Sequence, residues 1–295
     1  MDEDLSNAGT DTPTPAAAQT DRLPVPEGLR PWVTALVGVE LGAAGPMPLA
    51  IAPHDAMMLT LQFARDGDRI EAKRELGSNT CITGIRHWTG RFSGAGDCVT
   101  LFALLTPLGA VQLLNSRQLD AGPRIRAPLA LLLDPRFTRS LESSVALAPD
   151  MPTRLHRFAA WLEQRALARG LQERAALRAA RAAMRVCAEP LAPMLDVADE
   201  QHVSRRQIER DFSRWLGVTP RHLSQVARVQ GVARRVHAGA ALADAAADMG
   251  FADQSHMNRV VRQLTGLTPP AFARSRRSPL AGAFRAATGG GTVYL

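Results

Sequence analysis

The segment SRRQIERDFSRWLGVTP, residues 204–220, decides the fold of the last third of this chain. A second segment, DQSHMNRVVRQLTGLTP, occupies residues 253–269 and repeats the first at an offset of 49 positions. An arginine, a glycine and a Thr-Pro pair recur at matched places in the two segments. Two segments in register predict two equivalent structural units.

Each segment predicts a helix with one apolar and one polar face. Ser204 is a favourable N-cap for the first helix. At about 100° per residue, apolar and polar side chains then fall on opposite sides of both helices. The predicted apolar faces are Ile208, Phe212 and Trp215 in the first helix, and Met257, Val261 and Leu264 in the second. The predicted polar faces are Arg206, Arg210 and Ser213, and Ser255, Arg259 and Arg262.

A short helix is expected before the second segment. Residues 242–249, LADAAADM, are mostly small helix formers, and Gly250 follows them. A glycine there provides the tight turn that lets two helices cross closely. The pattern therefore predicts a helix-turn-helix.

The charge of the chain is divided unevenly. Residues 201–295 contain 14 arginines against five acidic residues, a net +9, whereas residues 1–200 contain 21 basic and 23 acidic residues, a net −2. A basic module on a near-neutral body is typical of a domain that binds a polyanion. Arginine can bridge guanine, and asparagine can pair with adenine, in the DNA major groove. Solvated surface arginines are the alternative, and their repetition in register argues against it.

These residues resemble a known family. DQSHMNR, residues 253–259, preceded by Gly250-Phe251 and followed by TGLTP, resembles the C-terminal signature of AraC/XylS-type transcription regulators. SRRQIERDF, residues 204–212, is similar to that family's first recognition helix. The resemblance covers residues 190–275 and implies two helix-turn-helix units joined by a long helix, residues 220–237. It implies contacts with a double-stranded DNA operator from Arg205, Arg206, Glu209, Arg210, Gln254, Ser255, Asn258 and Arg259.

Several positions depart from the pattern that the resemblance implies, among them Gly231 and Gln201. Gly231 is expected to interrupt the joining helix at a cost of about 1 kcal/mol. Gln201 is expected to fill the turn position that Gly250 fills in the second unit.

The front of the chain has a different pattern. Residues 1–26 are acidic and rich in Thr, Pro and Ala, which predicts a disordered tail. Residues 27–149 contain short apolar runs separated by turn-forming residues, and Asp66-Gly67 is a hairpin signal. The clearest runs are residues 33–39, 57–63, 81–88 and 99–105. This pattern predicts a β-rich sensor or dimerisation domain, an antiparallel sandwich or barrel.

Helical spacing begins after residue 149. Leu155, Phe158, Leu162 and Ala166 recur at that spacing, Gly170 breaks the run, and an Ala/Arg-rich helix is expected over residues 171–187. We therefore expect a helical linker over residues 150–189 and a flexible tail over residues 276–295. The predicted class is α+β: a β-rich domain with helices, then an all-α domain of two helix-turn-helix units.

The cysteines and histidines favour no catalytic or metal site. Cys81, Cys98 and Cys187 are an odd, widely spaced set without a CxxC pair, so neither a disulfide framework nor a zinc site is expected. His54, His87 and Cys81 lack the spacing of a cupin-type metal site. The alternatives left open are a Cys81–Cys98 redox switch, a DNA-repair fusion with a nucleophilic cysteine, and a cupin-type metalloenzyme.

The expected function follows from the reader and the front domain. We expect a transcription regulator, specifically an activator, that binds a DNA operator and RNA polymerase and responds to a small-molecule effector through its N-terminal domain. A homodimer is expected, and no enzyme activity, metal or cofactor. The start MDEDL lacks a basic, apolar leader, and the apolar residues 99–114 are short and interrupted by Pro107, so we expect a cytoplasmic protein with no membrane partner.

Overall fold

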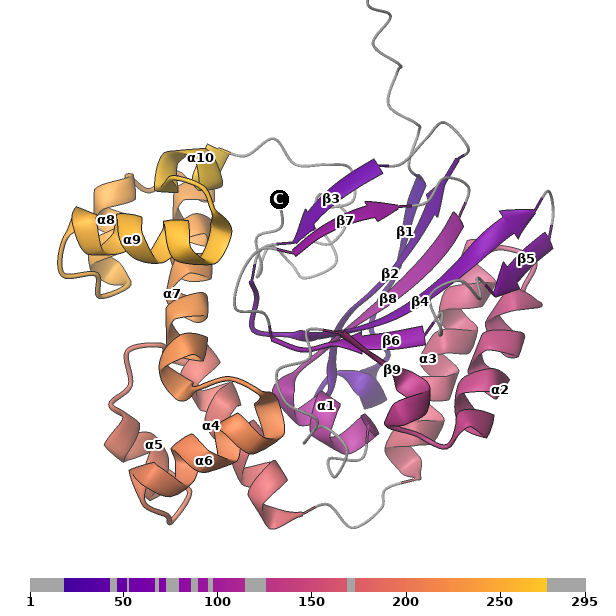
Figure 1. Ribbon diagram of the computed structural model, residues 1–295, viewed down its shortest axis with the longest axis horizontal. Helices are drawn as coiled ribbons and strands as arrows, with labels where there is room; N and C mark the ends of the chain where they lie inside the picture. Colours follow the sequence, from indigo (N-terminus) through magenta and orange to yellow (C-terminus); the bar gives the residue numbers. More distant parts are fainter. Residues whose placement is uncertain are drawn as a thin grey trace, which may run out of the picture.

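The computed structural model describes residues 19–42, 47–51, 53–66, 69–72, 80–85, 90–94, 98–114, 126–168 and 173–274. An antiparallel sheet with helices occupies the front of the chain and a helical region follows it, which confirms the predicted α+β class. Figure 1 shows the curved sheet on one side of the molecule and the C-terminal helices on the other. The predicted tail residues 1–18 and 276–295 lie outside the described residues.

Two antiparallel sheets form the front domain (Figure 1). The main sheet contains β1 (Gln19–Leu23), β2 (Val33–Leu41), β4 (Met57–Asp66), β5 (Arg69–Ala72), β6 (Thr80–Thr83), β8 (Cys98–Leu105) and β9 (Arg126–Pro128). Its order is β1-β2-β8-β4-β6-β9, with β5 paired to β4. A separate pair consists of β3 (Met47–Ile51) and β7 (Gly90–Gly94).

The strongest apolar runs become the central strands. Runs 33–39, 57–63 and 99–105 fall in β2, β4 and β8, and every residue of β8 is buried. The Asp66-Gly67 signal is confirmed, because β4 and β5 pair antiparallel with Asp66 opposite Arg69. In the described part of run 81–88, which ends at residue 85, the short β6 ends at Thr83 before Gly84. A glycine without a side chain to pack is a poor strand residue.

The prediction of a disordered tail is wrong for its last residues. Residues 19–23, placed in a disordered tail, form β1 and pair with β2 from Gln19 opposite Glu40 to Leu23 opposite Leu36. The segment QTDRL has little apolar content to reveal a strand. Its backbone groups instead hydrogen-bond to the otherwise open edge of β2.

The α-helices in the described part of the front domain are α1 (Pro107–Leu114), α2 (Pro135–Ala146) and α3 (Met151–Leu167). The predicted stripe of Leu155, Phe158, Leu162 and Ala166 is buried, and α3 packs on β1 and β2. Helix α2 packs on α3 and begins after Asp134, whose carboxylate accepts from the Arg136 N–H.

Between residues 173 and 274, all of which the structure describes, the helices are α4 (Arg174–Ala188), α5 (Met194–Glu200), α6 (Arg205–Leu216), α7 (Pro220–His237), α8 (Leu242–Asp248), α9 (Gln254–Thr265) and α10 (Pro269–Arg274). Helices α5 and α6 lie at one end of α7, and α8 and α9 lie at the other (Figure 1). Helix α4 was predicted as part of a linker, yet it packs against α1, α6 and α7. Its buried face is mainly alanine, which allows neighbouring helices to approach closely.

The buried residues form two separate cores. The larger core runs without a break from the sheet through α4 to α6 and ends at Leu223 in α7. The smaller core begins at Val226 and contains the inner faces of α8, α9 and α10. The first helix-turn-helix unit therefore shares a core with the front domain, whereas the second has a core of its own.

Candidate nucleic-acid interface

Local signals determine where the two candidate recognition helices begin and end. Ser204 Oγ accepts a hydrogen bond from the Gln207 N–H at 3.2 Å, and Asp253 Oδ1 accepts one from the His256 N–H at 2.6 Å. These caps satisfy backbone donors that have no partner within the helix. Each helix then ends at a glycine in the left-handed conformation, Gly217 with φ 69° and Gly266 with φ 73°. The Ser204 cap of α6 was predicted from the sequence, and α9 begins and ends with the same kinds of signal.

The two faces of each helix are divided as predicted. The apolar residues Ile208, Phe212, Trp215, Met257, Val261 and Leu264 are all buried. The predicted polar faces, Arg206, Arg210, Ser213, Ser255, Arg259 and Arg262, are all exposed. Each helix is thus anchored on one side and presents arginine and short polar groups on the other.

All eight predicted DNA-contact residues lie on α6 or α9. Asn258 is half-buried and the other seven are exposed. Arg205 Nε and Glu209 Oε1 are 2.9 Å apart and pair one helical turn apart on α6. Among the described residues, no ion pair includes Arg206, Arg210 or Arg259. Their charges are therefore available to phosphates or base edges.

The turn of the first unit differs from the prediction by one residue. His202, not Gln201, adopts the left-handed conformation, with φ 53° against 67° for Gly250. The His202 N–H donates to the Asp199 carbonyl, as the Gly250 N–H donates to the Ala247 carbonyl. The loop of the second unit is one residue longer, so a constant offset of 49 misaligns the two turns.

Arg228 of α7 holds the turn of the second unit. Its Nε donates to the Met249 carbonyl at 2.7 Å, and its Nη2 donates to the Gly250 carbonyl. Its guanidinium also lies over the Phe251 ring, 4.1 Å from the centroid. Partial burial lowers the pKa of Arg228, which nevertheless stays cationic at neutral pH. This contact could not be predicted from the sequence, because the partners are backbone carbonyls in the turn after α8.

Gly231 does not interrupt α7. The helix runs unbroken from Pro220 to His237. A Cβ at Gly231 would lie 2.5 Å from Cε and 2.7 Å from Sδ of Met249. The glycine therefore makes room for α8, and this close approach offsets the helix propensity that it lacks.

A buried ion pair ties α6 to α4. Asp211, whose side chain is 4% exposed, accepts from Arg178 Nε at 2.7 Å and from Arg178 Nη2 at 2.6 Å. Its other oxygen accepts from Gln207 Nε2 at 2.7 Å. Sequence reasoning missed this cluster, because the partners are 33 positions apart in two predicted domains. It fixes the first recognition helix to the helix that precedes the reader.

The front domain contacts the second half of α7. Gln230 is buried, and its Nε2 donates to the Pro53 carbonyl at 2.7 Å. Burial raises the pKa of Asp55, while its backbone hydrogen bond and the nearby Arg234 oppose that rise. The pKa of the Cys187 thiol is also raised, mainly by burial and then by Asp55. A polar cluster therefore lies between the loop before β4 and the helix that joins the two units.

The described residues give little support to the alternative functions, which are a metalloenzyme, a redox switch and a nucleophilic cysteine. Within the ranges given above, no group of three or more His, Cys, Asp or Glu residues could hold a metal ion. His54 is buried and its Nδ1 accepts from the Ala56 N–H, which fits a core role, while His87 lies outside those ranges. Cys81 and Cys98 are both buried. The raised pKa of Cys187 disfavours the thiolate that a nucleophilic cysteine needs.

Residues 197–275 match the family described as "Helix-turn-helix domain", which confirms that motif. Comparison with curated proteins gives no match. Among solved structures, ToxT from Vibrio cholerae O395 is 11% identical, with 87% of this chain and 96% of that chain covered and a TM-score of 0.39. The AraC-like transcriptional activator CuxR is 12% identical over 70% of this chain and 74% of its own, with a TM-score of 0.20. No helix among the described residues is long and apolar enough to cross a membrane.

Proposed function

We propose that this chain, whose residues 197–275 are a helix-turn-helix domain of the AraC type, is a sequence-specific DNA-binding transcription regulator. The observation that carries the proposal is the matched pair α6 and α9. Each helix buries an apolar face and exposes arginines, and the two lie at opposite ends of one continuous helix. A surface of this kind is complementary to a negatively charged groove.

The length of α7 supports simultaneous contact with two grooves. Its 18 residues extend about 27 Å at the rise of an α-helix. Successive major grooves on one face of DNA are about 34 Å apart. With their own reach added, side chains of α6 and α9 can enter neighbouring grooves without bending the joining helix.

We assign the contacts by side-chain chemistry. Arg206, Arg210 and Arg259 would contact phosphates or guanine edges, and Asn258 would pair with adenine. Gln254 and Ser255, in the first turn of α9, would contact bases or the backbone. Arg205 and Glu209 already pair with each other, so we assign them a positioning role beside the bases.

The proposed domains differ from the sequence prediction at three boundaries. We propose that the sensor domain begins at residue 19 and ends at residue 168, since β1 and α3 belong to its packing. We propose that the reader begins at residue 173, because α4 contributes the Arg178 partner of Asp211. A fragment that begins at residue 190 would lack α4 and Arg178, so that carboxylate would lose its ion pair and keep Gln207 as its side-chain partner.

We further propose that the front domain regulates the reader. The shared core and the hydrogen bond from Gln230 to Pro53 provide physical routes between them. A small effector bound by the front domain would act by shifting the population of DNA-competent geometries. In full, we propose a cytoplasmic activator without enzyme activity that dimerises and contacts RNA polymerase.

Selection of binding sites from random double-stranded DNA, followed by footprinting, tests the proposal. We expect two protected major grooves on one face, about one helical turn apart. Affinity should fall steeply with salt, because bound arginines release counterions from the phosphates. The double variant Arg210→Ala/Arg259→Ala is the matched control. Selection that enriches no sequence, or that the double variant reproduces unchanged, would overturn the proposal.

A further inference from the structure

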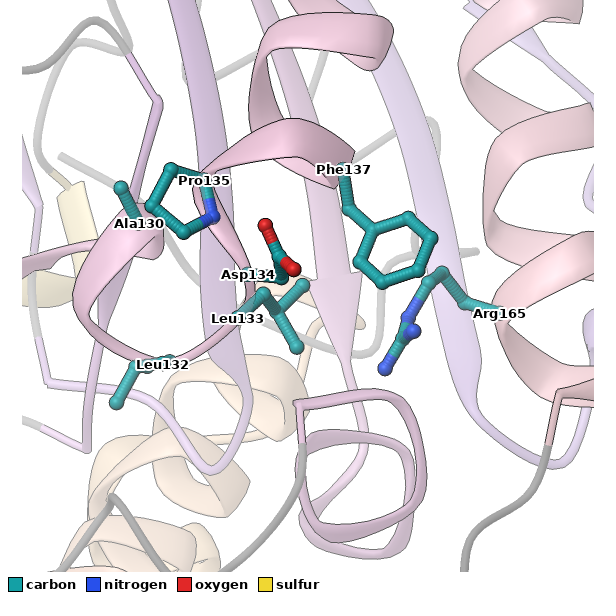
Figure 2. Close-up of a pocket in the computed structure, with 7 residues that line it drawn as sticks. All are labelled: Ala130, Leu132, Leu133, Asp134, Pro135, Phe137 and Arg165. Carbon is teal, nitrogen blue, oxygen red and sulfur yellow. The ribbon is translucent and has the colours of Figure 1, made fainter.

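A pocket lies in the front domain, away from the reader. It has a volume of about 560 Å³ and is lined by Ala130, Leu132, Leu133, Asp134, Pro135, Phe137 and Arg165. Figure 2 shows Phe137 and Arg165 on one side, Ala130 and Pro135 on the other, and Leu133 between them. Most of the lining is apolar, and one cationic side chain enters from α3. Pockets that hold small ligands commonly have this size and composition.

Arg165 is the unusual member of the lining. Its Nε and Nη2 donate to the Leu113 carbonyl at 3.4 and 3.2 Å, and its guanidinium lies 5.3 Å from the centroid of the Phe137 ring. Burial lowers the pKa of this guanidinium, and no carboxylate offsets that effect. Among the described residues, no ion pair includes Arg165. A partly buried cation with donors to spare is complementary to an anion.

The carboxylate in the pocket wall is already engaged. Asp134 accepts from Nε and Nη2 of Arg136 and caps α2 through the Arg136 N–H. These hydrogen bonds lower the pKa of Asp134 to about 2, so it stays ionised at neutral pH. Apart from Arg165, the rest of the lining is apolar, so a second anionic group on a ligand would find no cationic partner there. The wall therefore favours one carboxylate over two.

We propose that this pocket binds a small monocarboxylic acid with an apolar body. The carboxylate would accept from the remaining donors of Arg165, and the body would pack on Leu132, Leu133, Pro135 and Phe137. The proposal rests on the proposed function in one respect, namely that such a ligand would be the effector of the regulator.

A chain of contacts leads from the pocket to the reader. Arg165 holds the carbonyl of Leu113 in the last turn of α1, and α1 packs on α4. Helix α4 in turn holds α6 through the ion pair of Arg178 with Asp211. An anion on the remaining donors of Arg165 would pull on the guanidinium that holds the Leu113 carbonyl of α1. Binding at the pocket would therefore change how α4 positions the first recognition helix.

Calorimetric titration of the full chain tests the binding itself. Benzoate and hexanoate are the probes, with benzamide and hexanamide as uncharged matches and adipate as a dicarboxylate. We expect both monocarboxylates to bind at least about tenfold more tightly than their amides, since a charge-assisted hydrogen bond contributes that much. Adipate should bind more weakly than hexanoate.

Three variants identify the site. Arg165→Gln should remove the preference for the carboxylate, whereas Arg30→Gln, an exposed arginine outside the pocket, should keep it. Ala130→Phe should fill the pocket and weaken both probes, and it decides the matter if Arg165→Gln does not fold. Binding of neither monocarboxylate, equal binding of acid and amide, or full binding by Ala130→Phe would overturn the proposal. Operator binding is measured separately, so its loss would overturn the proposed function and leave this site standing.

Discussion

Replacing Arg178 by methionine should loosen the first recognition helix from the body of the protein. Methionine keeps most of the apolar stem but removes the guanidinium that donates twice to Asp211. The carboxylate would then keep a single side-chain partner, Gln207. This substitution therefore tests the contribution of the ion pair while leaving the alanine packing of α4 unchanged.

The structure sets the expected magnitude. Removing one partner of a buried ion pair costs about 3–5 kcal/mol, because a charge is left without compensation. The Arg178 side chain is 21% exposed, so water can reach part of the vacated volume. We therefore expect a loss near the lower limit, about 3 kcal/mol of the free energy of unfolding.

Arg185 provides a matched control on the same helix. It pairs with Glu189 and Glu200, whose side chains are 64% and 44% exposed. Exposed pairs contribute about 0–1 kcal/mol, so Arg185→Met should change stability far less than Arg178→Met. Adding Asp211→Leu to Arg178→Met should recover much of the loss by removing the uncompensated charge.

Urea denaturation followed by circular dichroism measures the stabilities, and operator titration at fixed salt measures the function. Arg178→Met should weaken operator binding as well, because α6 would be less firmly positioned. If Arg178→Met and Arg185→Met cost the same, the buried pair does not anchor the reader and the reasoning is wrong.

Three further predictions concern α7 and the surfaces around it. Arg210→Ala and Arg259→Ala should each weaken specific binding by about 1–3 kcal/mol with unchanged melting temperature, and unchanged affinity in both would contradict their assignment. Gly231→Ala should change the free energy of unfolding by less than about 1 kcal/mol, because the gain in helix propensity is offset by displacement of the flexible end of Met249. In a Met249→Ala background the same change should be clearly stabilising, and an equal effect of Gly231→Ala in both backgrounds in urea denaturation would refute the close approach. Because the pKa of Asp55 is raised in the folded protein, protonation of this carboxyl stabilises the fold below about pH 4, and that stabilisation is lost as the pH rises through the folded-state pKa. Asp55→Asn should therefore gain melting temperature relative to the parent over that rise. A difference in melting temperature that does not change with pH would count against this prediction.

The recognition helices were predictable because their signals are local. Ser204 and Asp253 cap the starts, and Gly217 and Gly266 provide the left-handed ends. Each signal acts within four residues of the backbone group that it satisfies. The central strands were predictable for a related reason, since burial on both faces leaves a continuous apolar run.

Features that depend on distant partners were not predictable. Nothing near Arg178 indicates that Asp211 will be buried against it, and nothing in β1 indicates that it will complete the edge of β2. The predicted interruption of α7 at Gly231 was wrong because it considered helix propensity alone and not the packing of Met249, at the end of α8, against this glycine. His202 was missed because a residue with a Cβ adopts the left-handed conformation there. In each case tertiary packing overrides the local preference.

The division of the interior between Leu223 and Val226 has a genetic consequence. Substitutions that disrupt the smaller core, for example at Val261 or Phe272, should leave the front domain and α6 folded. Such alleles would produce a protein that still occupies half of an operator and competes with the intact one. Alleles that disrupt the larger core should instead remove the whole protein, so the dominant alleles of this gene should cluster after residue 225.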